Sequence, residues 1–383
     1  MTDTVAIVGG GPVGAALALA LNDSGLALTV LEKNAELPLN DARTLALAHG
    51  TRLILERLGV WSALAESATP ITRIHVSQRG GFGRCEMRAK DMDLPALGYT
   101  VRYGDLLRVL SAALDASAAT VLRGASVTDA APGRVEYAYQ DQTQVVNADL
   151  IALAEGGKSL PDSGAPVKQY GQSALVCTVQ TELPHGGVAY ERFTAQGPIA
   201  LLPEPGALPR YFSVVWTTPD AELEHRLQQS DTDFMVALQQ AFGDRQGRFV
   251  ACGPRAAFPL RQALPGPGDT PGLIRIGNAA QTLHPVAGQG FNLGLRDAWQ
   301  LAQVVLDATP GSLGEAVLLA AYRKARGMDV KAGARMTDGL VELFMPSLPG
   351  LPLARGLALT AMDMLPPLKH LFARKMTFGS RTW

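Results

Sequence analysis

The stretch from Gly277 to Asp297, GNAAQTLHPVAGQGFNLGLRD, places the strongest constraint on how this chain can fold. It follows a short apolar strand at 273–277 and leads into a helix predicted to begin near Gln289 or Gly290. A strand, a glycine loop and a helix N-terminus together direct backbone N–H groups at an electron-rich ligand. Because Gly288 and Gly290 lack a Cβ, a flat ring could lie against the backbone there. Taken alone, the stretch could equally be a glycine-rich turn before a core helix.

A second nucleotide-binding signature lies at the start of the chain. Residues 4–8 form a short apolar strand, and Gly9 to Gly14 carry the pattern GxGxxG before an Ala/Leu-rich helix. A second strand, at 27–31, ends at Glu32, whose carboxylate could accept hydrogen bonds from ribose hydroxyls. In this pattern Gly9 permits the tight turn, Gly11 lets a pyrophosphate approach the backbone, and Gly14 lets helix and strand pack closely.

The segments after Glu32 predict the rest of a nucleotide-binding fold. Arg43 precedes a predicted helix at 44–58 and could reach a phosphate or a flavin edge, or could be a solvated loop cation. Residues 71–78 and 83–88 predict a hairpin, and 120–123, 134–139 and 143–146 a small meander. Asp105 could cap a helix, and a buried strand at 148–154 leads into a second glycine-containing loop at 155–159.

Composition limits the class of protein. With 383 residues, 47% hydrophobic and 18% charged, the chain suits a well-packed globular protein of one or two domains. The formal net charge of −1 gives no basic excess for nucleic acid. Three scattered cysteines show neither a disulfide framework nor metal-ligand spacing, which predicts a reducing cytoplasm and no metal site. No signal peptide and no apolar run of ~18–20 residues is evident.

The middle of the chain predicts an inserted domain. From residue 171, period-2 alternation and turn signals predict a mostly antiparallel sheet with one helical segment near 220–242. We therefore expect an α/β fold with a Rossmann-like FAD-binding domain at 1–170 plus 265–345 and an inserted β-sheet substrate domain at 171–264. An apolar face of that sheet could form a wall over the ligand, or its residues could be ordinary core. The predicted wall residues are Tyr190, Phe193, Leu201 and Trp216.

The C-terminal residues 346–383 predict a helical tail. They are rich in Leu and Pro, and cationic side chains outnumber acidic ones. The cations are Arg355, Lys369, Arg374, Lys375 and Arg381, against the single acidic residue Asp363. An apolar, locally basic segment could touch a membrane surface. It could equally pack on the core with its cations in solvent. We expect a cytoplasmic protein and leave peripheral contact at the inner membrane face open.

The two signatures, at the ends of a split domain, resemble those of the flavoprotein aromatic hydroxylases. That family carries GxGxxG near its start and a late PxxGQGxNxGxxD, matched here from Pro285 to Asp297, and the resemblance covers nearly the whole chain. Within the family, residues 41–51, 189–203 and 277–297 most resemble the ubiquinone-biosynthesis hydroxylases of the UbiH type. The resemblance implies a monooxygenase that uses FAD, O₂ and NAD(P)H to hydroxylate 2-polyprenyl-6-methoxyphenol through a C4a-hydroperoxyflavin. Contacts with other ubiquinone-biosynthesis proteins are left open.

The resemblance also implies site residues. The glycines of the first motif would hold the pyrophosphate, Glu32 the ribose, and Gly277-Asn278 the ribityl chain. Arg43 would lie near the flavin, and the residues from Pro285 to Asn292 would line its ring. The full predicted cofactor set is Gly9, Gly11, Pro12, Val13, Gly14, Glu32, Lys33, Arg43, Gly277, Asn278, Pro285, Gly288, Gln289, Gly290, Phe291 and Asn292.

Two residues depart from the family pattern, and more than one residue is a candidate for assisting catalysis. The family's late motif has Asp where Asn278 stands, and its middle motif has Asp where Glu155 stands, so the electron donor stays open. A phenol reacts faster when it is ionised, and His185, His284 and Arg192 are candidates to assist it. The rivals are a sister hydroxylase acting at another ring position or on another aromatic substrate, a flavin dehydrogenase, and a flavin-binding scaffold without oxygen activation.

Overall fold

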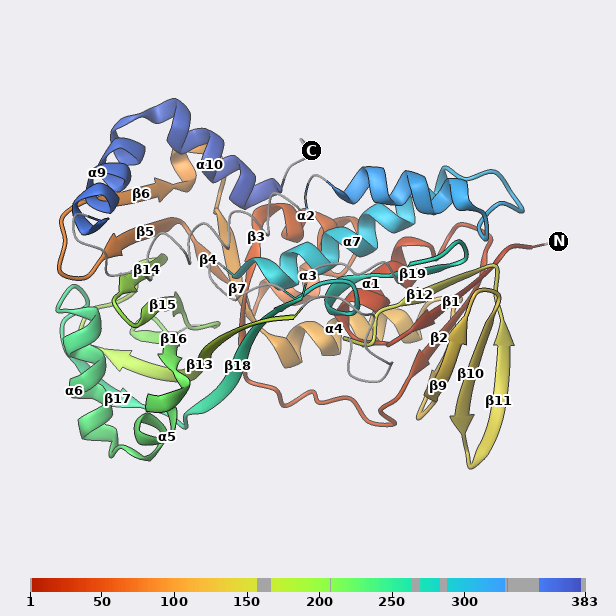
Figure 1. Ribbon diagram of the computed structural model, residues 1–383, viewed down its shortest axis with the longest axis horizontal. Coiled ribbons are helices and arrows are strands. Elements are labelled where there is room, and N and C mark those ends of the chain that lie inside the picture. Colours follow the sequence, from red (N-terminus) through yellow and green to blue (C-terminus); the bar gives the residue numbers. More distant parts are fainter. Residues whose placement is uncertain are drawn as a thin grey trace.

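The computed structural model describes residues 2–156, 167–206, 208–263, 269–282, 288–327, 329 and 351–379. It has a parallel sheet with its helices at one end and a large antiparallel sheet at the other (Figure 1). Two C-terminal helices lie beside the antiparallel sheet, and a small three-stranded sheet lies at the opposite end. The α/β fold predicted from the sequence, with a parallel nucleotide-binding sheet and an antiparallel sheet, is confirmed.

The parallel sheet has the strand order β19-β12-β1-β2-β8. Its strands are almost entirely apolar because both faces are covered. Helices α1, α4 and α7 pack on one face, and the meander β9–β11 packs on the other. The bounds are β1 Thr4–Val8, β2 Ala27–Glu32, β8 Thr120–Arg123, β12 Leu150–Leu153, β19 Leu273–Arg275, α1 Pro12–Ala20, α4 Tyr103–Asp115, α7 Gln289–Leu306, β9 Ser126–Ala131, β10 Arg134–Tyr139 and β11 Gln142–Asn147.

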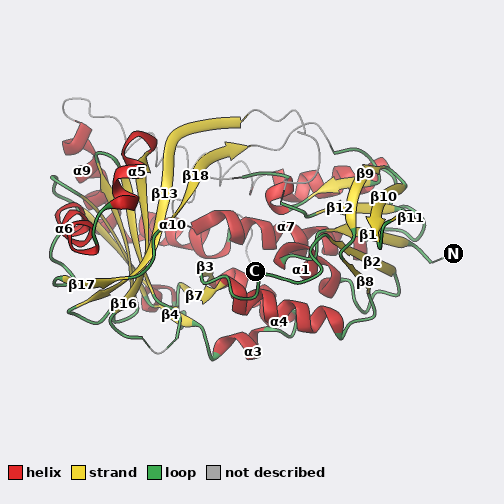
Figure 2. Cartoon of the chain, turned by 90° about the horizontal axis from the view of Figure 1, so that it is seen from below, coloured by secondary structure: helices red, strands yellow, loops and turns green. Residues whose placement is uncertain are grey.

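The large sheet is antiparallel except where β14 pairs with β5 in parallel, and we call it the antiparallel sheet. Its eight strands have the order β17-β13-β16-β15-β14-β5-β6, with β18 also paired to β13. Helices α5 and α6 lie at its outer side (Figure 2). Strands β5 and β6 come from the N-terminal segment but pair in the same sheet as the strands of the predicted inserted domain. The predicted domain boundaries at 170 and 265 therefore stay a proposal. The bounds are β5 Arg73–Gln78, β6 Arg84–Arg88, β13 Val167–Thr181, β14 Val188–Thr194, β15 Gly197–Pro203, β16 Tyr211–Pro219, β17 Phe249–Cys252, β18 Ala256–Ala263, α5 Asp220–Gln228 and α6 Asp231–Phe242.

Three local predictions were wrong. The expected helix at 44–58 is a strand, β3 (Thr44–Ala48), followed by α2 (His49–Arg57), because the alternation TLALA pairs with β7 (Gly98–Arg102). Strand β8 joins the parallel sheet beside β2 instead of the meander. Helix α4 already begins at Tyr103, so Asp105 lies in its first turn and does not cap it. The other short elements are α3 Trp61–Ala65, β4 Thr69–Ile71, η1 Ala89–Met92 and η2 Gly277–Ala279.

The C-terminal segment is helical, as predicted, where the structure describes it. Residues 316–327 are helical, and α9 (Leu351–Met364) and α10 (Pro366–Phe378) follow. Helix α9 packs on β6 and β5, while α10 contacts α2 and β3, so the tail joins the antiparallel sheet to the small sheet β3-β7-β4 (Figure 1). None of the helices in the described part of the chain has the length and apolar character needed to cross a membrane.

A buried ionic cluster joins the end of the parallel sheet to α7. One carboxylate oxygen of Asp297 accepts hydrogen bonds from the backbone N–H of Gly277 at 3.0 Å and from Gln281 at 2.6 Å. The other accepts from Arg326, which also pairs with Asp329. Burial raises the pKa of Asp297, and the Arg326 guanidinium opposes that shift. The cluster holds the loop after β19 against the helix that follows it.

Removal of this carboxylate should destabilise the whole protein. In Asp297→Ala, the buried Arg326 would keep one carboxylate partner where it had two, and the Gly277 N–H would lose its acceptor. Since breaking a buried ion pair leaves uncompensated charge, we expect the free energy of unfolding to fall by about 3–5 kcal/mol, measured by urea titration. Asp307→Ala, at the exposed end of the same helix, should change it by less than about 0.5 kcal/mol. Equal effects of the two substitutions would contradict this role of Asp297.

Candidate cofactor and substrate site

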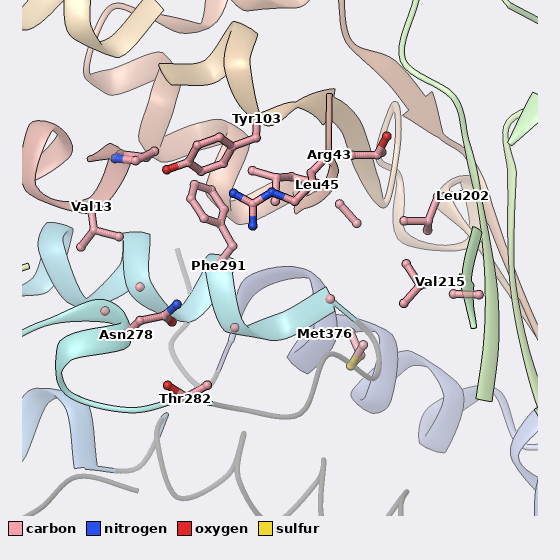
Figure 3. A pocket seen from close by; sticks show the side chains of 18 of the residues that line it. Val13, Arg43, Leu45, Tyr103, Leu202, Val215, Asn278, Thr282, Phe291 and Met376 are labelled. Carbon is pink, nitrogen blue, oxygen red and sulfur yellow. The ribbon is translucent and has the colours of Figure 1, made fainter. Parts of the chain in front are cut away.

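A single cavity of about 930 Å³ runs from the two glycine loops to the antiparallel sheet. This volume is at the upper end of the usual range for small-molecule sites. In Figure 3, Val13, Asn278 and Thr282 lie at one end and Leu202 and Val215, from the sheet, at the other. Arg43, Tyr103, Phe291 and Met376 lie between these two groups. The cavity therefore has one end built by the nucleotide-binding fold and one end built by the sheet.

The first glycine loop leaves open backbone at the cavity. A Cβ at Gly14 would lie 1.9 Å from the carbonyl oxygen of Gly9, so only glycine lets α1 approach β1 this closely. At Gly11, which is the N-cap of α1, a Cβ would have no atom within 4 Å in the described part of the chain. Gly11 thus presents bare backbone and a helix N-terminus to the cavity, as pyrophosphate binding requires.

Glu32 has a structural role that the sequence did not predict. Its carboxylate, 7% exposed, accepts a hydrogen bond from the Gly10 N–H at 2.7 Å. Its other oxygen accepts from the backbone and side chain of Asn34 at 2.8 and 2.7 Å. Because each carboxylate oxygen can accept more than one hydrogen bond, Glu32 holds the loop and can still face a ribose from the cavity wall.

The N-terminus of α7 forms the next part of the cavity. Its N-cap, Gly288, has φ +61°, a left-handed conformation that favours glycine. A Cβ at Gly290 would meet no atom of the described residues within 4 Å. Asn292 does not border the cavity: it is 1% exposed, accepts from the Ala48 N–H and Thr51, and donates to the carbonyls of Ala46 and Gly288. It therefore braces the helix start against β3 and α2.

Arg43 projects into the middle of the cavity (Figure 3). It forms a bidentate pair with Asp41, with N–O distances of 3.0 Å to Oδ1 and 2.6 Å to Oδ2, and lies 4.9 Å from the Tyr103 ring centre. The hydrogen bond to Asp41 raises the pKa of the guanidinium, and burial raises the pKa of Tyr103. The partners hold this cation in the middle of the cavity, where an anionic group would bind.

Most described residues of the predicted cofactor set border this cavity, and three do not. Those that border it are Gly9, Gly11, Pro12, Val13, Glu32, Lys33, Arg43, Gly277, Asn278, Gly288, Gly290 and Phe291. Gly14, Gln289 and Asn292 are absent from the lining and support it from behind. Pro285 and the catalytic candidate His284 lie outside the described residues.

The predicted sheet wall was largely assigned to the wrong face. Tyr190, Leu201 and Trp216 belong to the core between the sheet and α6; of these, Tyr190 alone also borders the cavity. Because strand side chains alternate between faces, a shift of one residue reverses the assignment. Phe193 does border the cavity, together with Ala189, Glu191, Ala200, Leu202, Val215 and Thr217, which the sequence reasoning had not selected.

The other catalytic candidates also lie away from the cavity. Arg192 points to the opposite face, where it donates to the Ser77 hydroxyl at 3.3 Å. Desolvation, with Arg79 and Arg245 nearby, lowers its pKa. His185 accepts a hydrogen bond from the Gly187 N–H at 3.0 Å in the loop before β14. Neither residue is among those that line the cavity.

The C-terminal helices supply lining residues that the sequence reasoning had not named individually. Arg355, Ala358, Leu359 and Met362 of α9 border the cavity, as do Phe372 and Met376 of α10. The spacing of 355, 358, 359 and 362 is that of one helix face, a signal that was available in the sequence. The tail therefore closes the apolar end of the cavity.

The residues present fit FAD. Bare backbone at Gly11 and Gly290 leaves room for a pyrophosphate and for a flat ring, and the start of an 18-residue helix adds N–H groups and a favourable dipole. Asn278 offers an amide to hydroxyl groups of the ribityl chain. No group of three or more His, Cys, Asp or Glu in the described ranges is placed to hold a metal ion.

Comparison with known proteins gives the same assignment. The model of the FAD-binding domain family matches residues 2–335. The ubiquinone hydroxylase UbiL of Rhodospirillum rubrum is 34% identical, over 97% of this chain and 88% of its own. The 3-demethoxyubiquinol 3-hydroxylase of Escherichia coli is 32% identical, over 96% of each chain.

Solved structures share the fold. The p-nitrophenol 4-monooxygenase PnpA of Pseudomonas putida aligns over all of both chains with a TM-score of 0.73 and 17% identity. The probable FAD-dependent monooxygenase pqsL of Pseudomonas aeruginosa aligns over 94% of this chain and all of its own, with a TM-score of 0.78 and 17% identity. Together with the family match over residues 2–335, this shows that the chain belongs to the FAD-binding domain family of FAD-dependent monooxygenases.

Proposed function

We propose that this monooxygenase hydroxylates the ring of a polyprenylated phenol, 2-polyprenyl-6-methoxyphenol, in ubiquinone biosynthesis. The supporting observation is one continuous cavity with a dinucleotide-type end and an apolar end closed by α9 and α10. An apolar end of this size suits a substrate with a hydrocarbon tail. Relatives at 32–34% identity are named as hydroxylases of ubiquinone or demethoxyubiquinol.

The cofactor is proposed to lie along the cavity from Gly11 to Gly290. Gly9, Gly11, Pro12 and Val13 would hold the pyrophosphate with the N–H groups of α1, and Glu32 and Lys33 would flank the adenosine. FAD, when bound, supplies the redox chemistry, with NAD(P)H as the donor typical of this family.

The chain's own part in the reaction would be to position the substrate, to neutralise negative charge on the ring and to exclude water. The N-terminus of α7 would face the edge of the ring where negative charge develops. Arg43 would add positive charge beside it. The apolar sheet face and α9 and α10 would keep solvent away from the reacting atoms.

The outer side of the same two C-terminal helices is proposed to contact a membrane surface. Leu353 and Leu357 of α9 and Leu368 and Leu371 of α10 are between 47% and 58% exposed, and Met364, at the end of α9, is 74% exposed. Exposed cations lie on α10, at Arg374 and Lys375. Apolar side chains next to cations are typical of helices that lie in the membrane interface. A substrate dissolved in lipid could then enter the cavity past the helices that line it.

Filling the space at Gly290 should block FAD while the fold is kept. At its Cβ, a valine there would meet none of the residues that the structure describes, but it would occupy the cavity. Since overpacking costs about 1–3 kcal/mol, we expect FAD affinity to fall by about tenfold to a hundredfold, measured by quenching of flavin fluorescence. Gly327→Val, also on a helix, also without a described neighbour within 4 Å of its Cβ and outside the cavity lining, should bind FAD as the unmodified protein does. Unchanged affinity in Gly290→Val would count against this placement of the ring.

The substrate can be identified from products and from accumulated precursors. With FAD, NADPH and O₂, the purified protein should convert a prenylated methoxyphenol to its hydroxylated product and act poorly on the same phenol without its tail. A strain lacking the gene should lose ubiquinone and accumulate the methoxyphenol. Accumulation of a different precursor would indicate a sister hydroxylase, and NADPH oxidation without any hydroxylated product would indicate a dehydrogenase. Efficient hydroxylation of the tailless phenol alone would refute the quinone assignment.

Membrane contact predicts binding to anionic vesicles. The protein should co-sediment with vesicles of phosphatidylglycerol and phosphatidylethanolamine, more at low salt than at high salt. The double variant Leu368→Asp/Leu371→Asp should bind several-fold less, because two charges would enter the interface. Val317→Asp, at a 63% exposed position of another helix, is the matched control and should bind normally. If the unmodified protein stays in the supernatant at low salt, there is no such contact.

A further inference from the structure

A row of five side chains crosses the cavity face of the antiparallel sheet. In register, Cys85 of β6 lies beside Val76 of β5, Val76 beside Glu191 of β14, Glu191 beside Ala200 of β15, and Ala200 beside Val215 of β16. All five border the cavity. The centre of an otherwise apolar row is therefore occupied by a carboxyl group.

Glu191 is unusual among the acidic side chains of the site. The carboxylate of Glu32 holds the first glycine loop, and Glu155, which also lines the cavity, has a partner as well. Glu191 has no hydrogen-bond or ion-pair partner among the described residues. Desolvation raises its pKa to about 7. A polar group kept in an apolar wall without a partner costs free energy, which a ligand that supplies the partner would recover.

Charged side chains are scarce in the part of the cavity that the sheet builds. Of the cavity-lining residues on the described strands of this sheet, it alone carries a charge. Its neighbour Arg192 faces the other way, toward Ser77. The other charged groups of the cavity are Glu32, Lys33, Arg43 and Glu155 at the cofactor end, and Arg355 on α9.

We propose that Glu191 accepts a hydrogen bond from the phenolic hydroxyl of the substrate and so fixes which ring edge faces the cofactor. This rests on the proposed function, because it takes a phenol as the ligand. Such a substrate is apolar apart from the oxygens on its ring, so a lone carboxyl in an apolar wall would recognise its hydroxyl. With the oxygen at β14, the tail would extend toward the space that α9 and α10 enclose.

The proposal can be tested by binding, without turnover. The probes are a short-chain prenylated methoxyphenol and its O-methyl ether, which lacks the O–H donor, titrated into the FAD-loaded protein without NADPH. Since a hydrogen bond to a charged group is involved, we expect the unmodified protein to prefer the phenol by about tenfold or more. Glu191→Gln, which keeps an acceptor oxygen, should retain a preference for the phenol. Glu191→Leu, which extends the apolar row, should retain FAD and bind both probes equally.

Controls separate this inference from the proposed function. Glu224→Leu, at an exposed position of α5, should behave as the unmodified protein does. If Glu191→Leu does not fold, Glu191→Met serves as the second apolar variant, and the preference of the unmodified protein is informative by itself. Equal binding of phenol and ether by the unmodified protein, or a preference that survives in the apolar variants, would overturn the role of Glu191 and leave the proposed function intact. Failure of the unmodified protein to bind either probe would refute the proposed function and this inference with it.

Discussion

The site depends on one constraint: the start of α7 must be held against the carboxyl end of the parallel sheet. Strand β12 lies between β1 and β19, so the loops after β1 and β19 open on the same edge. Two buried side chains of α7 then fix the helix. Asp297 binds the loop after β19 through the Gly277 N–H, and Asn292 binds β3 and α2. With both in place, glycine backbone from the two ends of the chain faces one cavity.

A second property follows from the alternation of side chains along strands. The core under α6 takes Val188 of β14 and Phe212, Val214 and Trp216 of β16, whereas the cavity is lined by Ala189, Glu191 and Phe193 of β14 and by Val215 and Thr217 of β16. Tyr190 contributes to both. The same sheet therefore builds a core on one side and a substrate wall on the other. The C-terminal helices use their two sides in a comparable way, since α9 and α10 line the cavity and also expose leucines. The apolar end of the site is thus shared by elements far apart in sequence.

The sequence predicted well what short-range chemistry determines. Both glycine motifs, the start of α7 and the strand-helix-strand unit at the N-terminus could be located because turns and helix starts depend on local residues. It failed where long-range pairing decides: residues 44–48 became a strand because β7 was available to pair with them. The face of Trp216 could not be known without the position of α6. The buried roles of Asn292 and Asp297 depend on partners more than 15 residues away.

The most direct test of the account is a titration of the flavin-free protein with FAD, read by flavin fluorescence, with ADP as competitor. If both glycine motifs hold opposite parts of one cofactor, one FAD should bind per chain, and ADP should compete with it by occupying the adenosine half alone. Protein that binds no FAD at excess concentration, or stoichiometric FAD binding that saturating ADP leaves unchanged, would contradict it.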